Sequence, residues 1–181
     1  MEKTNEAILP TGYLGMLMLM AAGYKLGKEE SIINEYKHLV PKLKKYLNRT
    51  ILPIDVAAEL KNGKRKDLAL SELPSNYPLY DVGKKTVDLY LKKIKSSETI
   101  FIKGLPGLCH TKAFTYGSEK ILRAIASSRA FSVVGGGHTL TIIEKLKIPK
   151  KKFGYVSLSG GALLYYLSEG TLPGLEAIKH K

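Results

Sequence analysis

The clearest indication of the fold is the sequence FSVVGGGHT, at residues 131–139. Its first part, Phe131 to Val134, is rich in apolar and β-branched residues and predicts a strand, and the apolar spacing over 139–146 predicts a helix. Three glycines join the two elements. Because glycine has no Cβ, the backbone there can approach a phosphate closely and point successive N–H groups at it. The helix that follows adds the positive end of its dipole.

A second stretch, YVSLSGGA at residues 155–162, repeats this arrangement one crossover later. A strand is predicted over 154–158 and a helix over 162–167. Two adjacent helix N-termini that face the same crevice suit a polyphosphate or a phosphoryl group in transfer. The alternative is that the glycines merely allow tight strand-to-helix turns, but their tandem occurrence favours anion binding. Neither turn is a P-loop or a dinucleotide-binding fingerprint, because no Gly-Lys-Ser/Thr sequence closes it and the G-x-G-x-x-G spacing is absent.

The remainder of the chain alternates between predicted strands and helices. Strands or β-rich runs are expected at 7–10, 50–54, 56–60, 67–70 and 99–102, with a hairpin signal at Asn62-Gly63 and a loop at 73–82. Helices are expected at 13–24, 28–47, 84–95 and 116–128, and Pro41 should kink or divide the second of them. Helices between apolar strands imply right-handed crossovers, so we predict an α/β fold: a Rossmann-like three-layer sandwich with a mostly parallel sheet. Ligands of such sheets bind beyond the carboxyl ends of the strands.

The composition indicates a globular cytoplasmic domain. The chain has 181 residues, of which 44% are hydrophobic, and 29 Lys and Arg against 16 Asp and Glu give a formal charge of +13. No apolar run is long enough to span a membrane, and the N-terminus lacks a signal-peptide pattern. The one cysteine, Cys109, excludes an internal disulfide and a cysteine-based zinc site. The lysines form separate clusters, which favours solvated helix faces over a nucleic-acid-binding surface. The net positive charge nevertheless favours anionic partners such as phosphates.

Several single residues are weaker candidates. His110 and His138 follow predicted strands and could meet a ligand, although a lone loop histidine is more often solvated. Cys109 beside His110 is disfavoured as a nucleophile pair, because adjacent residues on an extended chain point to opposite sides. Asp55 follows a β-rich run, where a carboxylate could bind a metal or act as a general base. Its alternative role is to cap a helix or turn. No cluster of His, Asp and Glu has the spacing of a metal site.

Taken in order, the motifs resemble those of phosphoglycerate kinases, specifically the C-terminal, nucleotide-binding domain of that family. The similar segments are TILPID (50–55), YDVGKKT (80–86), KGLPG (103–107), the glycine turn at 131–139, SLSGGA (157–162) and LPGL (172–175). They cover nearly the whole chain. The resemblance implies that residues 1–181 form this nucleotide-binding domain without its first strand segment and without the N-terminal substrate domain.

The resemblance also implies an activity, the transfer of a phosphoryl group between 1,3-bisphosphoglycerate and ADP in glycolysis and gluconeogenesis. ATP or ADP would bind together with Mg²⁺, which the nucleotide itself would mainly hold. No protein residue is assigned as a metal ligand. The second substrate, 1,3-bisphosphoglycerate or 3-phosphoglycerate, would bind through the absent N-terminal domain. The residues implied to act on the phosphoryl group are Gly136, Gly137, Ser159, Gly160 and Gly161. Those implied to bind the nucleotide are Gly12, Gly104, Pro106, Gly107, His110, Gly135, His138 and Thr139. Neither a membrane nor a nucleic acid is expected as a partner.

The sequence departs from the family pattern at several of these positions. His138 replaces the family's metal-holding Asp, His110 its ribose-binding Glu, Lys103 an Asn and Ser159 a Gly. In the family a Gly-Gly-Ala-Lys segment precedes the part that this sequence resembles, and its lysine contacts nucleotide phosphate. That segment is absent from the sequence given. We therefore expect a fragment or truncated gene product that binds nucleotide weakly and does not turn over alone. Two alternatives stay open: a non-catalytic degenerate kinase domain that binds protein or RNA, and an enzyme assembled from two polypeptides.

Overall fold

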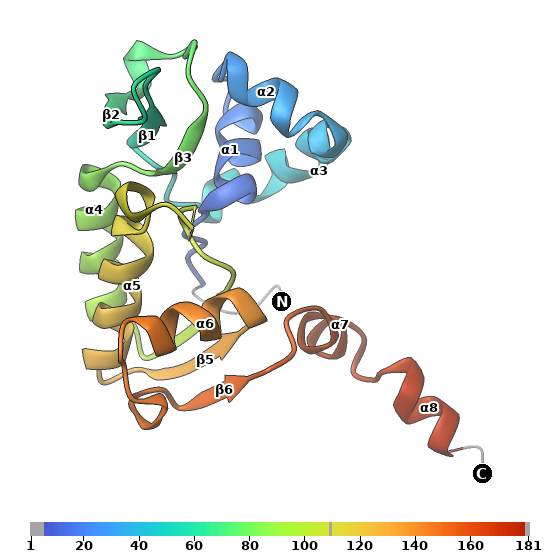
Figure 1. Ribbon diagram of the computed structural model, residues 1–181. Helices are drawn as coiled ribbons and strands as arrows, with labels where there is room; N and C mark the ends of the chain where they lie inside the picture. Colours follow the sequence, from blue (N-terminus) through green and yellow to red (C-terminus); the bar gives the residue numbers. More distant parts are fainter. Residues whose placement is uncertain (1–5, 109, 180–181) are drawn as a thin grey trace. The chain divides into compact units, whose positions relative to one another are not determined.

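The chain forms two compact units (Figure 1). The computed structural model describes residues 6–108 and 110–179. The first unit comprises residues 1–93 and 105–121, and the second comprises residues 94–104 and 122–181. Helix α5 (Tyr116–Ser127) begins in the first unit and ends in the second.

The first unit contains a three-stranded antiparallel sheet. Its strands are β1 (Asp55–Glu59), β2 (Arg65–Ala69) and β3 (Leu79–Val82), in the order β2-β1-β3. The hairpin that joins β1 to β2 confirms the prediction at Asn62-Gly63. Gly63 has a φ of +73°, and the backbone N–H of Lys64 donates to Asn62 Oδ1 at 3.1 Å.

Three predictions in this region were wrong. Neither the run at 7–10 nor that at 50–54 forms a strand, because only Ile8 and Thr50 pair, in one isolated parallel bridge, and regular pairing starts with β1. Pro53 contributes to this, since proline has no N–H to donate to a ladder. The predicted loop at 73–82 contains β3, because both of its prolines precede the strand and leave its N–H groups able to pair.

Short helices pack against this sheet through an apolar core. They are α1 (Gly12–Ala21), α2 (Lys28–Ile32) and α3 (Val40–Leu43), with 3-10 helices at Asn34–Leu39 and Lys44–Arg49. The single helix predicted over 28–47 is thus divided, and Pro41 lies in the first turn of α3, where a missing N–H breaks no helical hydrogen bond. The core residues are Met16, Leu17, Leu19, Leu26, Ile33, Val56, Ala58, Leu68 and Leu79.

The carboxylate of Asp55 caps a helix. It accepts hydrogen bonds from the backbone N–H groups of Lys85 at 3.0 Å and Thr86 at 2.7 Å, in the first turn of α4 (Lys84–Lys95). Gly83 leaves room for it, because a Cβ at that position would lie 2.1 Å from Asp55 Cγ. Of the two roles considered for Asp55, the structure therefore shows the cap.

The hydroxyl of Tyr90, on α4, links two distant segments of the first unit. Its oxygen lies 3.0 Å from the carbonyl oxygen of Pro10 and 2.9 Å from that of Ile51, and its single proton is shared between these two acceptors. Tyr90 is fully buried, and burial raises the pKa of its phenol. The link fixes the segment that leads into Gly12, the first residue of α1.

The second unit contains a three-stranded parallel sheet. Its strands are β4 (Thr99–Lys103), β5 (Phe131–Gly135) and β6 (Tyr155–Ser157), in the order β4-β5-β6. The helices that follow are α6 (Gly137–Lys145), α7 (Gly161–Glu169) and α8 (Pro173–Lys179), and α6 lies across β5 (Figure 1). The predicted α/β class with a parallel sheet flanked by helices is confirmed, and the antiparallel sheet of the first unit adds to it.

The two faces of this parallel sheet differ in burial. On one face Val134 of β5 is fully buried. On the opposite face, Phe101, Phe131 and Tyr155 are 43%, 57% and 55% exposed. The register that aligns Phe101 with Val133 and Tyr155 places these aromatic rings on one side.

The turn from β5 to α6 needs glycine at one position. Gly136, the N-cap residue of α6, has a φ of +107° and a ψ of 137°, a conformation that residues with a Cβ rarely adopt. Gly137, the next residue, has nothing within 4 Å of the position that a Cβ would take. The backbone of the turn therefore depends on Gly136 and not on Gly137.

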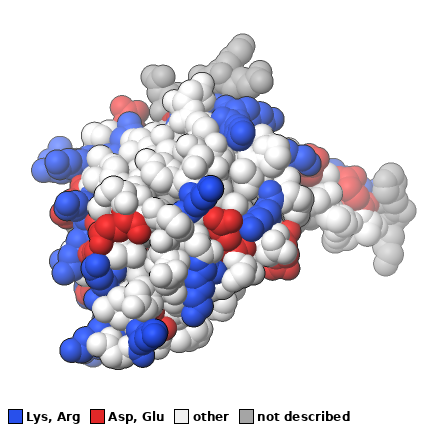
Figure 2. Space-filling view, turned by 90° about the horizontal axis from the view of Figure 1, so that it is seen from above, with Lys and Arg blue, Asp and Glu red and all other residues white. Residues whose placement is uncertain are grey.

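Charged side chains are dispersed over the face that Figure 2 shows, with Lys and Arg separated by Asp and Glu and without one continuous basic stripe. Several lysines pair with carboxylates, for example Lys66 with Glu72 at 3.0 Å and Lys150 with Glu144 at 2.8 Å. This is the arrangement expected of solvated surfaces. Within residues 6–108 and 110–179, no helix has the length and apolar character that crossing a bilayer requires.

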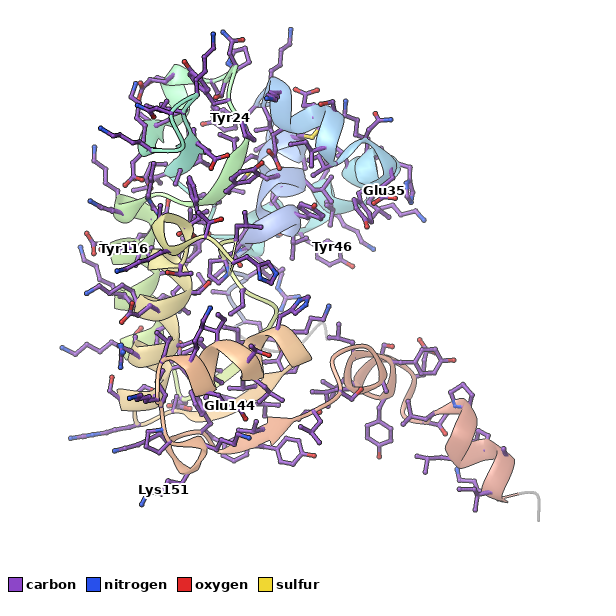
Figure 3. The ribbon with its side chains drawn as sticks, viewed as in Figure 1. Tyr24, Glu35, Tyr46, Tyr116, Glu144 and Lys151 are labelled. Atoms are coloured by element: carbon purple, nitrogen blue, oxygen red, sulfur yellow. The ribbon has the colours of Figure 1, made fainter. Side chains whose placement is uncertain are left out.

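Replacing Tyr90 by Phe should destabilise the first unit. The change leaves the carbonyl groups of Pro10 and Ile51 without this donor, and an unsatisfied buried polar group costs about 1–3 kcal/mol. Urea denaturation followed by circular dichroism measures the free energy of unfolding. Tyr24→Phe is the matched control, because Tyr24 is 39% exposed (Figure 3), and equal stability of the two variants would contradict this role of Tyr90.

Two neighbouring alanine substitutions should distinguish the effect of backbone conformation from that of steric crowding in the β5–α6 turn. Gly136→Ala should cost about 1–3 kcal/mol, because it forces a Cβ into a positive-φ conformation. Gly137→Ala should change stability by less than about 0.5 kcal/mol, since its Cβ meets open space at a helix start. Denaturation of both variants is the measurement, and an equal loss in both would show that the turn is not held by the φ of Gly136.

Candidate functional site

Three turns meet at one edge of the parallel sheet. The register aligns Lys103 with Gly135 and Gly135 with Ser157, so β4, β5 and β6 reach their carboxyl ends together. Each strand is followed there by glycine: Gly104, the 135–137 run and the 160–161 pair. This is the edge at which parallel α/β sheets bind ligands, as the sequence predicted.

The turns approach each other closely, and the tightest approach is at Gly160. A Cβ at Gly160 would lie 3.2 Å from the Cα of Gly136 and 3.4 Å from Cε of Lys103. A Cβ at Gly136 would lie 3.7 Å from the Thr139 hydroxyl oxygen and 4.0 Å from the backbone nitrogen of Gly104. The structure therefore brings the predicted residues of the second unit together at one place.

The hydroxyl group of Thr139 has no hydrogen-bond partner within the described part of the chain. The side chain is fully buried in the first turn of α6. The backbone N–H groups of a helix's first turn also lack partners within the helix. A buried hydroxyl left unpaired costs free energy, so its position beside these N–H groups indicates a place for a hydrogen-bonding ligand.

The turn after β6 is stabilised by a residue that the sequence analysis did not single out. Ser157 Oγ donates to the carbonyl oxygen of Ser159 at 2.9 Å and accepts from its N–H at 3.2 Å. Helix α7 then begins at Gly161, where a Cβ would meet open space. The two serines, spaced two apart before a helix, carried the signal, because such side chains bond to nearby backbone.

The remaining predicted residues lie in the first unit. Gly12 has a φ of +55°, and a Cβ there would lie 3.3 Å from the carbonyl oxygen of Leu105. Pro106 in the same turn is buried, and Gly107 packs so tightly that a Cβ would lie 2.0 Å from the carbonyl oxygen of Phe114. His110 is exposed, and Cys109 lies outside the described residues. The structure thus places Gly12 against the 105–107 turn.

The donor set at the three turns does not suit a magnesium ion. Mg²⁺ prefers carboxylate and other oxygen ligands in octahedral geometry, and the segments 103–108, 135–139 and 157–161 contain no Asp or Glu. His138 is exposed on α6. Across the described ranges there is no group of three or more His, Cys, Asp and Glu side chains that could hold a metal. These turns instead offer N–H groups, hydroxyls and one ammonium, which are ligands for anions.

Known proteins are similar to this chain in sequence and in fold. Among curated relatives, the phosphoglycerate kinase of Methanothermus fervidus is 36% identical, over 96% of this chain and 43% of that protein. The phosphoglycerate kinase of Haloarcula marismortui is 34% identical, over 98% of this chain and 46% of its own length. The chain therefore spans less than half the length of these archaeal relatives.

Solved structures agree with the sequence comparison. Phosphoglycerate kinase from Coxiella burnetii superposes with a TM-score of 0.77 and 30% identity, over 94% of this chain and 45% of that chain. The enzyme from Pyrococcus horikoshii OT3 gives a TM-score of 0.79 and 28% identity, over 93% and 44%. This likeness supports the Rossmann-like fold class. A family model for phosphoglycerate kinase matches residues 1–170, so the chain belongs to the phosphoglycerate kinase family.

Proposed function

We propose that this chain is the nucleotide-binding half of a phosphoglycerate kinase, and that the turns after β5 and β6 bind the phosphates of ADP and ATP. The transfer would run between 1,3-bisphosphoglycerate and ADP. The observation that supports this most directly is Thr139, whose buried hydroxyl has no partner among the described residues and sits at the start of α6. Family membership supplies the nature of the anion, a nucleotide phosphate.

Each turn has a distinct part in this proposal. Gly136, Gly137 and Thr139 donate hydrogen bonds to the nucleotide phosphates, with Gly135 and His138 beside them. Ser159, Gly160 and Gly161 present the N–H groups at the start of α7 to the phosphoryl group in transfer. No covalent intermediate is needed, because phosphoryl transfer is accelerated mainly by positioning and by stabilisation of developing charge.

The adenosine moiety is assigned by the resemblance to a different set of residues. Gly12, Pro106, Gly107 and His110 of the first unit, and Gly104 of the second, are the predicted contacts. The close approach of Gly12 to the Leu105 carbonyl supports the grouping of the first three, since a Cβ at Gly12 would lie 3.3 Å from that oxygen. Magnesium is expected to arrive with the nucleotide phosphates, because the turns offer it no carboxylate.

The second substrate would bind outside these residues. The relatives extend to more than twice the matched length, and 1,3-bisphosphoglycerate or 3-phosphoglycerate is assigned to that additional part. The chain alone should therefore bind nucleotide without turning over. Mixing it with a separately produced N-terminal half of the family and assaying ATP formation tests whether the two parts assemble into an enzyme.

Calorimetric titration of the 181-residue chain with Mg-ADP tests the nucleotide assignment. Saturable heat at millimolar or lower nucleotide concentration is the expected result. Absence of heat from a sample that circular dichroism shows to be folded would overturn the assignment. Salt-dependent RNA binding in that same sample would instead favour a non-catalytic binding module.

Thr139→Val should have opposite effects on stability and binding. The substitution removes a buried hydroxyl that has no partner in the described structure, so the ligand-free chain should be as stable as before or more stable. Affinity for Mg-ADP should fall about tenfold or more, because a hydrogen bond to a charged group contributes about 1.5–3 kcal/mol. Denaturation and calorimetry on the same preparation give both quantities.

Thr141→Val is the matched control for this experiment. Thr141 lies on the same helix but is exposed, and its hydroxyl donates to the carbonyl oxygen of Gly137 at 3.1 Å. Its replacement should leave nucleotide affinity unchanged. If Thr139→Val also leaves affinity unchanged, the Thr139 hydroxyl does not contact the ligand.

A further inference from the structure

We propose that Arg65 and Asp81 are positioning residues, whose buried ion pair holds in place the turn that carries the predicted adenosine contacts Pro106 and Gly107. This inference rests on the proposed function and deepens it, because it names side chains that fix the adenosine turn without touching the nucleotide. All four residues belong to the first unit.

The carboxylate of Asp81, on β3, contacts both ends of the segment that runs from this turn to α5. Its Oδ2 accepts a hydrogen bond from the backbone N–H of Gly117, in the first turn of α5, at 3.0 Å. A Cβ at Gly107 would lie 2.8 Å from Asp81 Oδ1, and a Cβ at Gly117 would lie 2.4 Å from the same atom. Both glycines therefore pack directly against this carboxylate, and its position determines theirs.

Arg65, on β2, supplies the opposite charge and further hydrogen bonds. Its Nη1 donates to Asp81 Oδ2 at 2.7 Å and to the carbonyl oxygen of Ala113 at 3.2 Å. Its Nη2 donates to the carbonyl oxygen of Val82 at 2.9 Å, and its Nε donates to Asp67 Oδ1 at 2.8 Å. The guanidinium group thus joins β2, β3 and the segment that leads into α5.

The ion pair lies inside the unit. The side chains of Arg65 and Asp81 are 11% and 0% exposed, and the guanidinium carbon lies 5.4 Å from the centre of the Tyr116 ring at the start of α5 (Figure 3). A buried carboxylate needs a partner charge, and a fully hydrogen-bonded buried network holds its members in one arrangement. Removing Arg65 would leave the carboxylate without its partner charge and free the groups that pack on it.

The turn at Gly107 is attached to the same two elements by its own backbone. The N–H of Leu108 donates to the carbonyl oxygen of Tyr80, the residue before Asp81, at 2.9 Å. The N–H of Gly107 donates to Oγ of Ser118, in the first turn of α5, at 3.4 Å. A displacement of the Asp81 carboxylate would therefore reach Gly107 directly, without any other side chain in between.

The test compares Arg65→Met and Arg65→Lys with Lys66→Met in the full chain. Lys66 is the matched control, because it is the next residue of β2 and also pairs with a carboxylate, Glu72, at 3.0 Å, but both of these side chains are about half exposed. Calorimetry with Mg-ADP, with adenosine and with inorganic pyrophosphate gives the affinities. Adenosine reports on the turn that carries Gly107, and pyrophosphate reports on the turns after β5 and β6.

Arg65→Met should weaken binding of Mg-ADP and adenosine about tenfold or more, because a displaced binding group loses much of its interaction energy. It should change the affinity for pyrophosphate less than about twofold, since that ligand binds to other residues. Arg65→Lys should recover only part of the loss, because lysine keeps the charge but lacks the fork that reaches Val82 and Ala113. Lys66→Met should bind all three ligands like the unmodified chain.

Trypsin cleavage measures the position of the segment without any ligand. Lys112 is exposed between Gly107 and Gly117, and Lys151 is an exposed site in the second unit. Both Arg65 variants should be cleaved faster after Lys112 and at an unchanged rate after Lys151, because only the first segment is released. If circular dichroism shows that Arg65→Met is unfolded, the folded Arg65→Lys variant decides the question by the same two measurements.

The outcomes separate this inference from the proposed function. If the chain binds Mg-ADP and the Arg65 variants bind it equally well, the positioning role is overturned while the nucleotide assignment stands. If the variants lose Mg-ADP and pyrophosphate to the same extent, the pair only stabilises the fold, and the positioning role is again overturned. If the folded, unmodified chain binds neither Mg-ADP nor adenosine, the nucleotide assignment falls and the positioning role falls with it.

Discussion

The second unit depends on the close approach of two stretches of backbone. Gly160 and Gly136 are so near that a single added Cβ would lie 3.2 Å from the opposite Cα. Because neither residue carries a side chain, the turns after β5 and β6 can come together and direct the starts of α6 and α7 to one edge. A Cβ at Gly160 would require these turns to shift by a few tenths of an ångström. The close approach of the two turns therefore depends on the absence of a side chain at Gly160.

Buried polar side chains in the first unit join segments that are far apart in sequence. Asp55 caps α4, and Tyr90 on that helix bonds to carbonyl groups at positions 10 and 51. Each bond uses a group that burial would otherwise leave unsatisfied, which explains why a carboxylate and a phenol lie inside the unit. A buried carboxylate after a β-rich run resembles a catalytic group in sequence, and here it has a structural role.

Local sequence signals predicted those parts of the molecule that are determined locally. The glycine turn at 131–139, the Asn62-Gly63 hairpin and helix α4 each depend on residues within a short span. Strand β3 was missed because its partner, β1, precedes it by about two dozen residues and the intervening prolines indicate a loop. The approach of Gly160 to Gly136 could not be predicted for a related reason, since it depends on a crossover that no local pattern contains.

The aromatic face of the parallel sheet has a consequence for how copies of this chain behave together. Within the described residues, β4 and β6 are the outer strands, and the rings of Phe101, Phe131 and Tyr155 are exposed beside them. An open strand next to apolar side chains is the surface through which sheets of separate molecules join edge to edge. Lysine clusters at 92–95 and 150–152 precede both outer strands, so two copies that align these edges bring like charges together. The surplus of positive charge thus opposes association of separate copies through electrostatic repulsion. Because concentrated salt screens this repulsion, it should make the protein aggregate.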